Sequence, residues 1–383
     1  MPNQKCPKCG KNTLHRGPKA ASGKVRWECK SGAGGEAIYC YSTTDPTAPY
    51  RERGGAELVS ETPINCANRE FQKTIVITWA QNATPVHKGF LSALLKYCSV
   101  NNASLMVIPG RYKNPTSRWE KSQRNAQWWD PVLQSFLFNR RHPLNNNLVV
   151  LGDIITQPTA TTPLTGFESI THGESGSLGH PKLQMTVIPT PHQRLPKILT
   201  TTGACTIENY SDTKAGKKGQ FHHVIGAVVV QLDADNKFHL RHINARGDGA
   251  FCDLDKAYYP GGEVLDAGAY PALIFGDAHP AFADPAVVRA TFDNGGLVER
   301  LNAKRLVFHD LMDSYSVNPH HRGNPFIAAA KRETGLDNVK REVQFTINWV
   351  KKMVGERKGI VVSSNHDDML SRWIKNADWR EDP

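Results

Sequence analysis

Three short apolar runs near the end of the chain are each followed by side chains that bind metal ions. They are Asp277 and His279 after residues 272–275, Asp310 and Asp313 after residues 305–308, and Asn365 and His366 after residues 359–362. Carboxylates and imidazoles suit Mn²⁺, Fe or Zn²⁺, and a carboxylate can bridge two ions. Two ions about 3.5–4 Å apart would hold a phosphate and activate a water molecule. The residue types therefore predict phosphoryl chemistry.

The apolar runs read as strands separated by helices, which we expect at residues 285–301 and 339–354. Parallel strands of such a layer bring their loops together at their carboxyl ends, where active sites usually lie. Further upstream, a strand, a helix and a strand are expected at residues 74–79, 89–97 and 105–108, strands at 148–151 and 185–188, and a hairpin at 224–232 and 237–243. The predicted fold class is α/β.

The order Asp-x-His, Asp-x-x-Asp, Asn-His-Asp resembles the calcineurin-like metallophosphoesterase superfamily over roughly residues 272–370. The resemblance implies a layered α/β fold with two divalent ions, for which Mn²⁺ is expected and Mg²⁺, Fe or Zn²⁺ are alternatives. It assigns Asp277 and His279 to the first metal, Asp310 to both metals, and Asn365 to the second. It also assigns His366 to the scissile phosphate, as a general acid or charge stabiliser, and Asp313 to support of the second motif by hydrogen bonding.

The match departs from the family pattern in two ways. His309 and Ser364 stand where the family usually has glycine, and no histidine follows His366 before Pro383. The family continues with a lone His and then Gly-His-x-His, so we expect a C-terminally incomplete core that binds metal weakly or holds one ion. The alternative sources of the missing ligands are another chain or upstream histidines, namely His172, His180, His222, His223, His239 and His242.

The N-terminal cysteines predict a zinc ribbon. Cys6 and Cys9 are two residues apart, so both thiolates can face one tetrahedral ion, and Cys29 and Cys40 would close the site. The alternative is a half-site with two unrelated thiols. The later Cys66, Cys98, Cys205 and Cys252 are scattered singly and are expected to be ordinary buried thiols.

Positive charge gathers in the same N-terminal part of the chain. The whole sequence of 383 residues has a net charge of +11, and residues 1–30 contain eight Lys and Arg against one Glu. Such a cluster favours phosphate contacts, and an aromatic ring among the charges can stack on bases. The predicted nucleic-acid contacts are Lys8, Lys11, Arg16, Lys24, Arg26, Trp27 and, near the metal motifs, Arg322. A solvated basic face is the alternative.

The chain divides by pattern into a zinc-ribbon-like module (1–45), a polar linker (46–72), an α/β region of uncertain order (73–265) and a metallophosphoesterase-like core (266–383). No signal peptide or membrane-spanning run is evident in the sequence, so we expect a cytoplasmic protein without membrane contact. The sequence leaves open a homo-oligomer or a second protein as partner.

Residues 74–370 also resemble phage proteins that act early in infection, in host-DNA degradation and DNA transfer. The segments that carry this resemblance are ITWAQNATP (77–85), VIPGRYKNPT (107–116) and the metal motifs. It implies a phage-encoded, metal-dependent DNase in the host cytoplasm. Two alternatives stay open: a nucleotide or protein phosphatase of the same superfamily, and a non-catalytic DNA- or partner-binding protein with an incomplete metal site.

Overall fold

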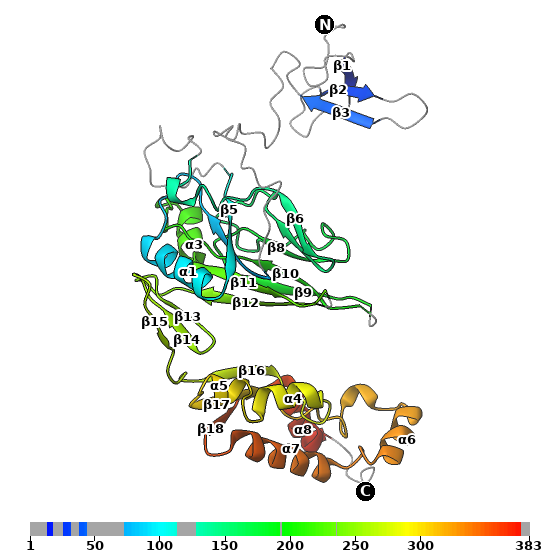
Figure 1. Cartoon of the computed structure of the whole chain (residues 1–383). Coiled ribbons are helices and arrows are strands. Elements are labelled where there is room, and N and C mark those ends of the chain that lie inside the picture. The colour runs from blue at the N-terminus through cyan, green and yellow to red at the C-terminus, as the bar shows by residue number, and fades with distance from the viewer. Residues whose placement is uncertain are drawn as a thin grey trace.

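A computed structural model describes residues 73–112, 128–191, 194–234 and 236–376, together with the backbone of three strands nearer the N-terminus. These strands are β1 (Leu14–Gly17), β2 (Arg26–Ser31) and β3 (Ile38–Thr43), which form an antiparallel sheet in the order β1-β2-β3 (Figure 1). Cys29 of β2 pairs with Tyr41 of β3, beside Cys40. Cys6, Cys9, Lys8, Lys11 and Lys24 lie outside the described residues, as does the predicted linker 46–72, so the zinc ribbon stays a prediction.

The first sheet of the central unit has the order β12-β11-β4-β5. It contains β4 (Thr74–Ala80), β5 (Ala103–Pro109), β11 (Gly226–Leu232) and β12 (Phe238–Asn244), and the helix α1 (Lys88–Val100) connects β4 to the parallel β5. The imidazole of His87 caps α1 by accepting a hydrogen bond of 3.1 Å from the amide of Phe90. The predicted β-α-β unit and the predicted hairpin are both confirmed.

Alternate residues of β4 serve two different cores. Val76 and Ala80 pack with Phe90 and Leu94 of α1, whereas Ile77 and its same-face neighbours pack against a second sheet. That sheet has the order β6-β7-β8-β10-β9, and its strands are β6 (Arg141–Asn145), β7 (Leu148–Leu151), β8 (Ser175–Leu178), β9 (Met185–Ile188) and β10 (Lys197–Thr201). The 3-10 turn η1 (Pro131–Leu133) and the helix α3 (Lys214–His222) complete the unit.

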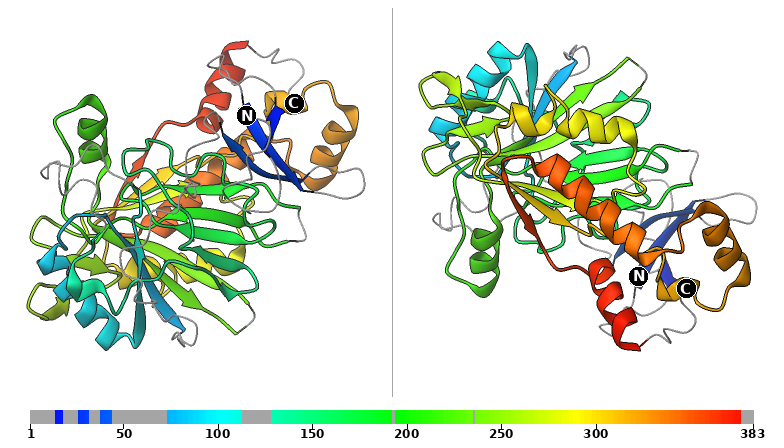
Figure 2. Two further views of the ribbon diagram at one scale, coloured as in Figure 1. Left: turned by 90° about the horizontal axis from the view of Figure 1, so that it is seen from above. Right: turned by 90° about the horizontal axis from the view of Figure 1, so that it is seen from below.

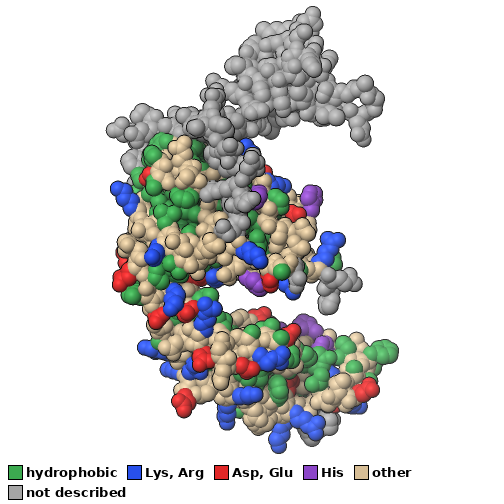
Figure 3. Space-filling view, viewed as in Figure 1, with side chains coloured by type: hydrophobic (Ala, Val, Ile, Leu, Met, Phe, Trp, Pro, Cys, Tyr) green, Lys and Arg blue, Asp and Glu red, His purple; other side chains and the backbone are tan. Residues whose placement is uncertain are grey.

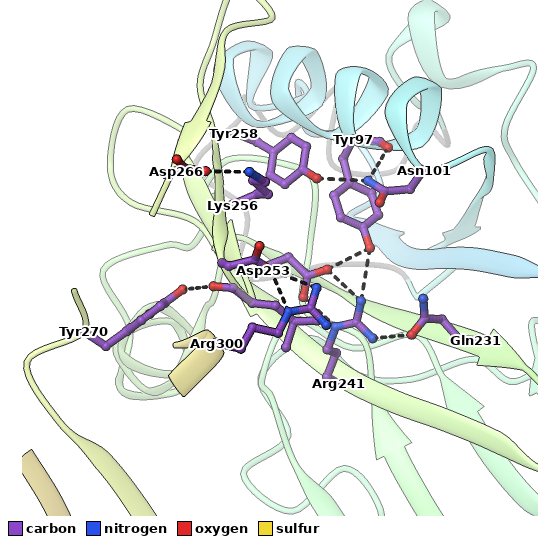
Figure 4. Close-up of polar contacts among 12 residues, drawn as sticks. Tyr97, Asn101, Gln231, Arg241, Asp253, Lys256, Tyr258, Asp266, Tyr270 and Arg300 are labelled. Atoms are coloured by element: carbon purple, nitrogen blue, oxygen red, sulfur yellow. Dashed lines mark hydrogen bonds and ion pairs between the residues drawn. The ribbon is translucent and has the colours of Figure 1, made fainter. Parts of the chain in front are cut away.

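A small antiparallel sheet follows, with the strands β13 (Phe251–Asp253), β14 (Lys256–Tyr258) and β15 (Val264–Asp266). Its Asp253 is held from two sides (Figure 4). The guanidinium of Arg241 donates to both carboxylate oxygens, at 2.5 and 2.7 Å, and the hydroxyl of Tyr97 donates at 2.8 Å. Because these partners come from β12 and α1, one carboxylate joins three elements.

The C-terminal unit is built on a parallel sheet in the order β16-β17-β18, with β16 (Leu273–Asp277), β17 (Arg305–His309) and β18 (Lys358–Val361). The surrounding elements are α4 (Pro285–Phe292), α5 (Leu297–Arg300), η2 (Pro319–His321), α6 (Pro325–Thr334), α7 (Val339–Val354) and α8 (Asn365–Asn376) (Figure 2). Phe308 packs against Phe292 and Trp349, so α4 and α7 both cover the sheet.

The helix predicted over residues 285–301 is divided in two. It stops at Phe292 and resumes at Leu297, because Gly295 takes φ +77° and a Cβ at position 296 would collide with the carbonyls of residues 290, 291 and 293. The predicted helix over residues 339–354 is confirmed as α7, and the three parallel strands are confirmed. The chain is therefore a mixed α/β protein with several separate sheets.

Candidate metal centre

The three strands of the C-terminal sheet end side by side, as the sequence predicts. Asp277, the last residue of β16, lies in register with His309, the last residue of β17. Two backbone hydrogen bonds continue the pairing past the strand ends: the amide of Ala278 donates to the carbonyl of His309 at 3.1 Å, and the amide of His279 donates to that of Asp310 at 3.0 Å. The side chains of these turns therefore gather at one edge of the sheet.

Asp277, His309 and Asp310 form the first group of potential ligands, whose ligand atoms lie within 4.8 Å of one another. The imidazole Nδ1 of His309 lies 3.4 Å from Asp277 Oδ1 and 3.1 Å from Asp310 Oδ2. Asp310 is only 4% exposed, whereas Asp277 faces solvent. Burial alone would raise the pKa of Asp310, but the neighbouring Ser364 hydroxyl and His309 imidazole outweigh it and hold the pKa below its usual range.

His279, Asp313 and His366 form the second group, again within 4.8 Å. Asp313 Oδ1 lies 3.3 Å from Nδ1 of His279 and 3.9 Å from Nδ1 of His366, and the carbonyl of Asp313 lies 3.1 Å from that same Nδ1 of His366. The two imidazole rings meet edge to face at 4.8 Å. Asp313 thus contacts both histidines and fixes their positions.

The turns that carry these groups have an unusual backbone. His279, Asp310 and Ser314 take φ values of +35°, +46° and +53°, in the left-handed region that residues with a Cβ rarely adopt. Such strain is seen where the surrounding structure enforces a functional geometry. Here the enforcing contacts include the hydroxyl of Ser314, which donates to the carbonyl of His366 at 2.8 Å.

The structure divides the predicted ligands differently from the family assignment. Asp277 and His279, expected on one ion, fall in separate groups. His309, a ligand-type residue at a strand end to which the family pattern assigns no metal, is the shared neighbour of two carboxylates. Asn365 is exposed at the start of α8. The signal for His309 in the sequence is its place at a strand end, directly before Asp310.

The donor set fits a cation. Each group contains one polar atom that is shielded from solvent: Asp310 Oδ1 in the first group and His279 Nδ1 in the second. Neither atom makes a hydrogen bond with a described residue. A buried polar atom left unpaired costs about 1–3 kcal/mol, so most are paired in folded proteins. A divalent ion bound by carboxylate and imidazole atoms would remove that cost at Asp310 Oδ1, whereas His279 Nδ1 already lies 3.3 Å from Asp313 Oδ1.

The upstream histidines have other partners. His180 is buried between the carbonyl of Gln157 and the amide of Lys182, and burial lowers its pKa to about 4. His223 contacts the hydroxyl of Tyr210 at 2.8 Å, and His242 contacts Thr200 at 2.9 Å. Within the described ranges, none of these imidazoles lies in a group of three or more His, Cys, Asp and Glu ligand atoms.

The predicted nucleic-acid contacts are placed only in part. Arg322 is exposed at the end of η2 and lines a cavity beside the C-terminal helices. Arg16 and Trp27 are paired across β1 and β2, next to Arg26, and only their backbone is described. On the face in Figure 3, imidazoles lie at the edge of the C-terminal unit that is turned toward the central unit.

A mixed α/β chain with carboxylate and imidazole groups at the carboxyl edge of a parallel sheet defines a candidate metalloprotein. The chain is 31% identical to protein A1 of Escherichia phage T5 over 323 residues, which cover 81% of this chain and 58% of the phage protein. This similarity supports a phage-encoded early protein. The chain thus spans little more than half the length of that relative.

No family model matches the chain, and no solved structure matches it. Among the helices that the structure describes, none combines the length and the apolar character needed to cross a bilayer.

Proposed function

We propose that the C-terminal unit is a metal-dependent phosphodiesterase that acts on DNA during early phage infection. The observation that carries the proposal is the pair of ligand groups around Asp310 and Asp313, each with a buried polar atom that has no hydrogen bond. A bound divalent ion would supply a Lewis acid for the phosphate and lower the pKa of a water molecule.

The residues of the chain would have separate tasks in this reaction. Asp277, His309 and Asp310 would bind one cation, with Asp310 as the buried member of the group. His279 and Asp313 would bind a second. His366, 27% exposed as a side chain, would be accessible to a phosphate and could donate a hydrogen bond or a proton to it, while the Asp313 carbonyl holds its Nδ1.

The test is a nuclease assay on the full chain with Mn²⁺ and linear DNA, comparing the wild type with Asp310→Asn. The substitution keeps the shape of the side chain but removes its charge, and we expect activity to fall at least a hundredfold. Asp266→Asn, at an exposed carboxylate of β15 that pairs with Lys256, is the matched control. Activity that survives Asp310→Asn would disprove the proposed mechanism.

The N-terminal module belongs to the same proposal as a zinc-bound DNA contact. The spacing of Cys6 and Cys9 and the eight basic residues of positions 1–30 support it. We expect about one equivalent of zinc in the purified full chain by elemental analysis, lost in Cys9→Ser and retained in Cys252→Ser. Equal zinc content in both variants would exclude the ribbon.

A further inference from the structure

We infer that a cavity beside the metal centre binds one nucleotide of a DNA strand. The proposed function assigns the cleavage of that strand to the metal centre. The cavity, of about 790 Å³, lies between η2, α6 and α8. This is within the range of roughly 300–1,000 Å³ typical of small-ligand sites. The inference rests on the proposed function for the reaction. The nucleotide site itself is inferred from the residues that line the cavity.

The charge of the cavity lining suits a phosphate. Four basic side chains, Arg322, Lys331, Arg332 and Arg372, line it against one carboxylate, Asp337. Arg372 is paired with Asp368 of its own helix at 2.6 Å. Within the described part of the chain, Arg322 and Arg332 make no ion pair, so they are available to an anion.

Lys331 adds a fixed positive charge to the lining of the cavity. The residue is only 6% exposed. Its Nζ donates to the carbonyl of Ser316 at 3.3 Å and lies 4.8 Å from the ring centre of Tyr315. An ammonium held at low exposure interacts with an anion more strongly than one in water. The phosphate of a nucleotide would therefore be attracted to the η2–α6 side.

The α8 side of the cavity is apolar and suits a base. Met369 and Trp373 are four residues apart, so they lie on one face of the helix, opposite Ala328 and Pro325 of α6. Trp373 is half-buried, which leaves part of the indole open for contact. An aromatic face stacks on any base without sequence preference.

The same helix connects the cavity to the metal centre. His366 stands in the first turn of α8, and Met369, Trp373 and Asn376 follow it at spacings of three or four residues, so they share one face. A rise of 1.5 Å per residue places Trp373 about 10 Å along the axis from His366. A stacked strand advances about 3.4 Å per nucleotide, so the cavity lies roughly three nucleotides from the scissile phosphate.

The experiment uses the full chain carrying Asp310→Asn in EDTA, so that neither metal nor cleavage contributes. We titrate it with thymidine 5′-monophosphate and with thymidine by calorimetry. The monophosphate should bind at least tenfold more tightly than the nucleoside. Arg322→Ala, at an exposed side chain, should weaken binding at least fivefold, and Ala328→Trp, which places an indole in the cavity, should also weaken it at least fivefold. Lys217→Ala, in α3, is the control and should have no effect.

Two outcomes would overturn the inference: equal affinity for the two ligands, or binding that Arg322→Ala and Ala328→Trp leave unchanged. Failure of the proposed function looks different. A wild-type chain that cleaves no DNA with Mn²⁺, while the monophosphate still binds in this cavity, would refute the reaction and uphold the nucleotide site.

Discussion

The backbone amide of Met312 donates a hydrogen bond of 2.9 Å to Oδ1 of Asp367. The other oxygen of this carboxylate accepts from the hydroxyl of Ser364 at 2.7 Å. One side chain in the first turn of α8 therefore holds the loop that carries Asp310 and Asp313. Asp367 is not in either ligand group, and we assign it a positioning role.

Asp367→Ala should loosen that loop. The substitution leaves the Met312 amide without its acceptor, and an amide that loses its partner costs about 1–3 kcal/mol. We expect backbone hydrogen exchange in residues 310–316 to accelerate about ten- to a hundredfold by mass spectrometry. The control is Asp368→Ala, which removes an exposed helical ion pair worth about 0.3–0.5 kcal/mol. The same acceleration in both variants would contradict the role of Asp367.

His309→Ala should weaken metal binding even though the family pattern has no ligand at this position. Its Nδ1 lies within 3.4 Å of Asp277 and within 3.1 Å of Asp310, so its removal takes away a ligand or the group that orients two carboxylates. Removal of such partners typically lowers affinity about 10- to 100-fold. Calorimetric titration of the full chain with Mn²⁺ measures the change. His320→Ala, at an exposed imidazole of η2, should bind Mn²⁺ as the wild type does, and an unchanged His309→Ala affinity would remove His309 from the site.

Asp253→Ala should be the most destabilising of these substitutions. Asp253 is 9% exposed and is the shared acceptor of Arg241 and Tyr97, so its loss removes the only carboxylate that the structure, in the residues it describes, pairs with this half-buried guanidinium and takes away the acceptor of a buried hydroxyl. Breaking such a buried pair costs about 3–5 kcal/mol. Urea unfolding followed by circular dichroism should show this loss, with Tyr97→Phe costing about 1 kcal/mol. A cost under 1 kcal/mol for Asp253→Ala would show that the network does not hold the small sheet.

The stability of the central unit should fall as the pH drops below about 6.5. Burial lowers the pKa of His180 to about 4, so the unfolded chain binds a proton that the folded chain excludes. The stabilisation is complete above the unfolded pKa of about 6.5 and is lost progressively down to about 4, at up to roughly 1.4 kcal/mol per pH unit. Urea midpoints between pH 7 and 4 should decline less steeply in His180→Gln than in the wild type. His239→Gln, at an exposed imidazole, is the control, and identical slopes in all three proteins would contradict the prediction.

Much of the C-terminal unit could be predicted because its signals are local. Short strands, each with an apolar run of two or three residues, alternate with amphipathic helices, and this pattern predicts β16, β17, β18 and α7. The convergence of Asp277 and Asp310 follows from parallel pairing, which places strand ends at one edge. The apolar spacing predicts one helix over residues 285–301, and the break between α4 and α5 at Gly295 and Gly296 is not part of that spacing.

The grouping of the ligands could not be predicted from spacing. It depends on the left-handed turns at His279 and Asp310, which decide the direction of each side chain, and sequence patterns do not determine such angles. The order of the strands in the five-stranded sheet could not be predicted from the sequence either. Its strands β8 and β10 are parallel neighbours in the sheet, although β9 lies between them along the chain. This region of the sequence is rich in Thr, Pro and Gly.

At the left-handed turns, the residues that would make the fold most stable differ from the residues that can bind a metal ion. Each of His279, Asp310 and Ser314 occupies a conformation that glycine adopts without penalty. Glycine at such a position can make a protein sturdier while it deletes a functional group. Selection for thermal stability alone would therefore favour the loss of these side chains from this edge of the sheet. Laboratory evolution of a more stable variant should be screened for metal affinity at every round.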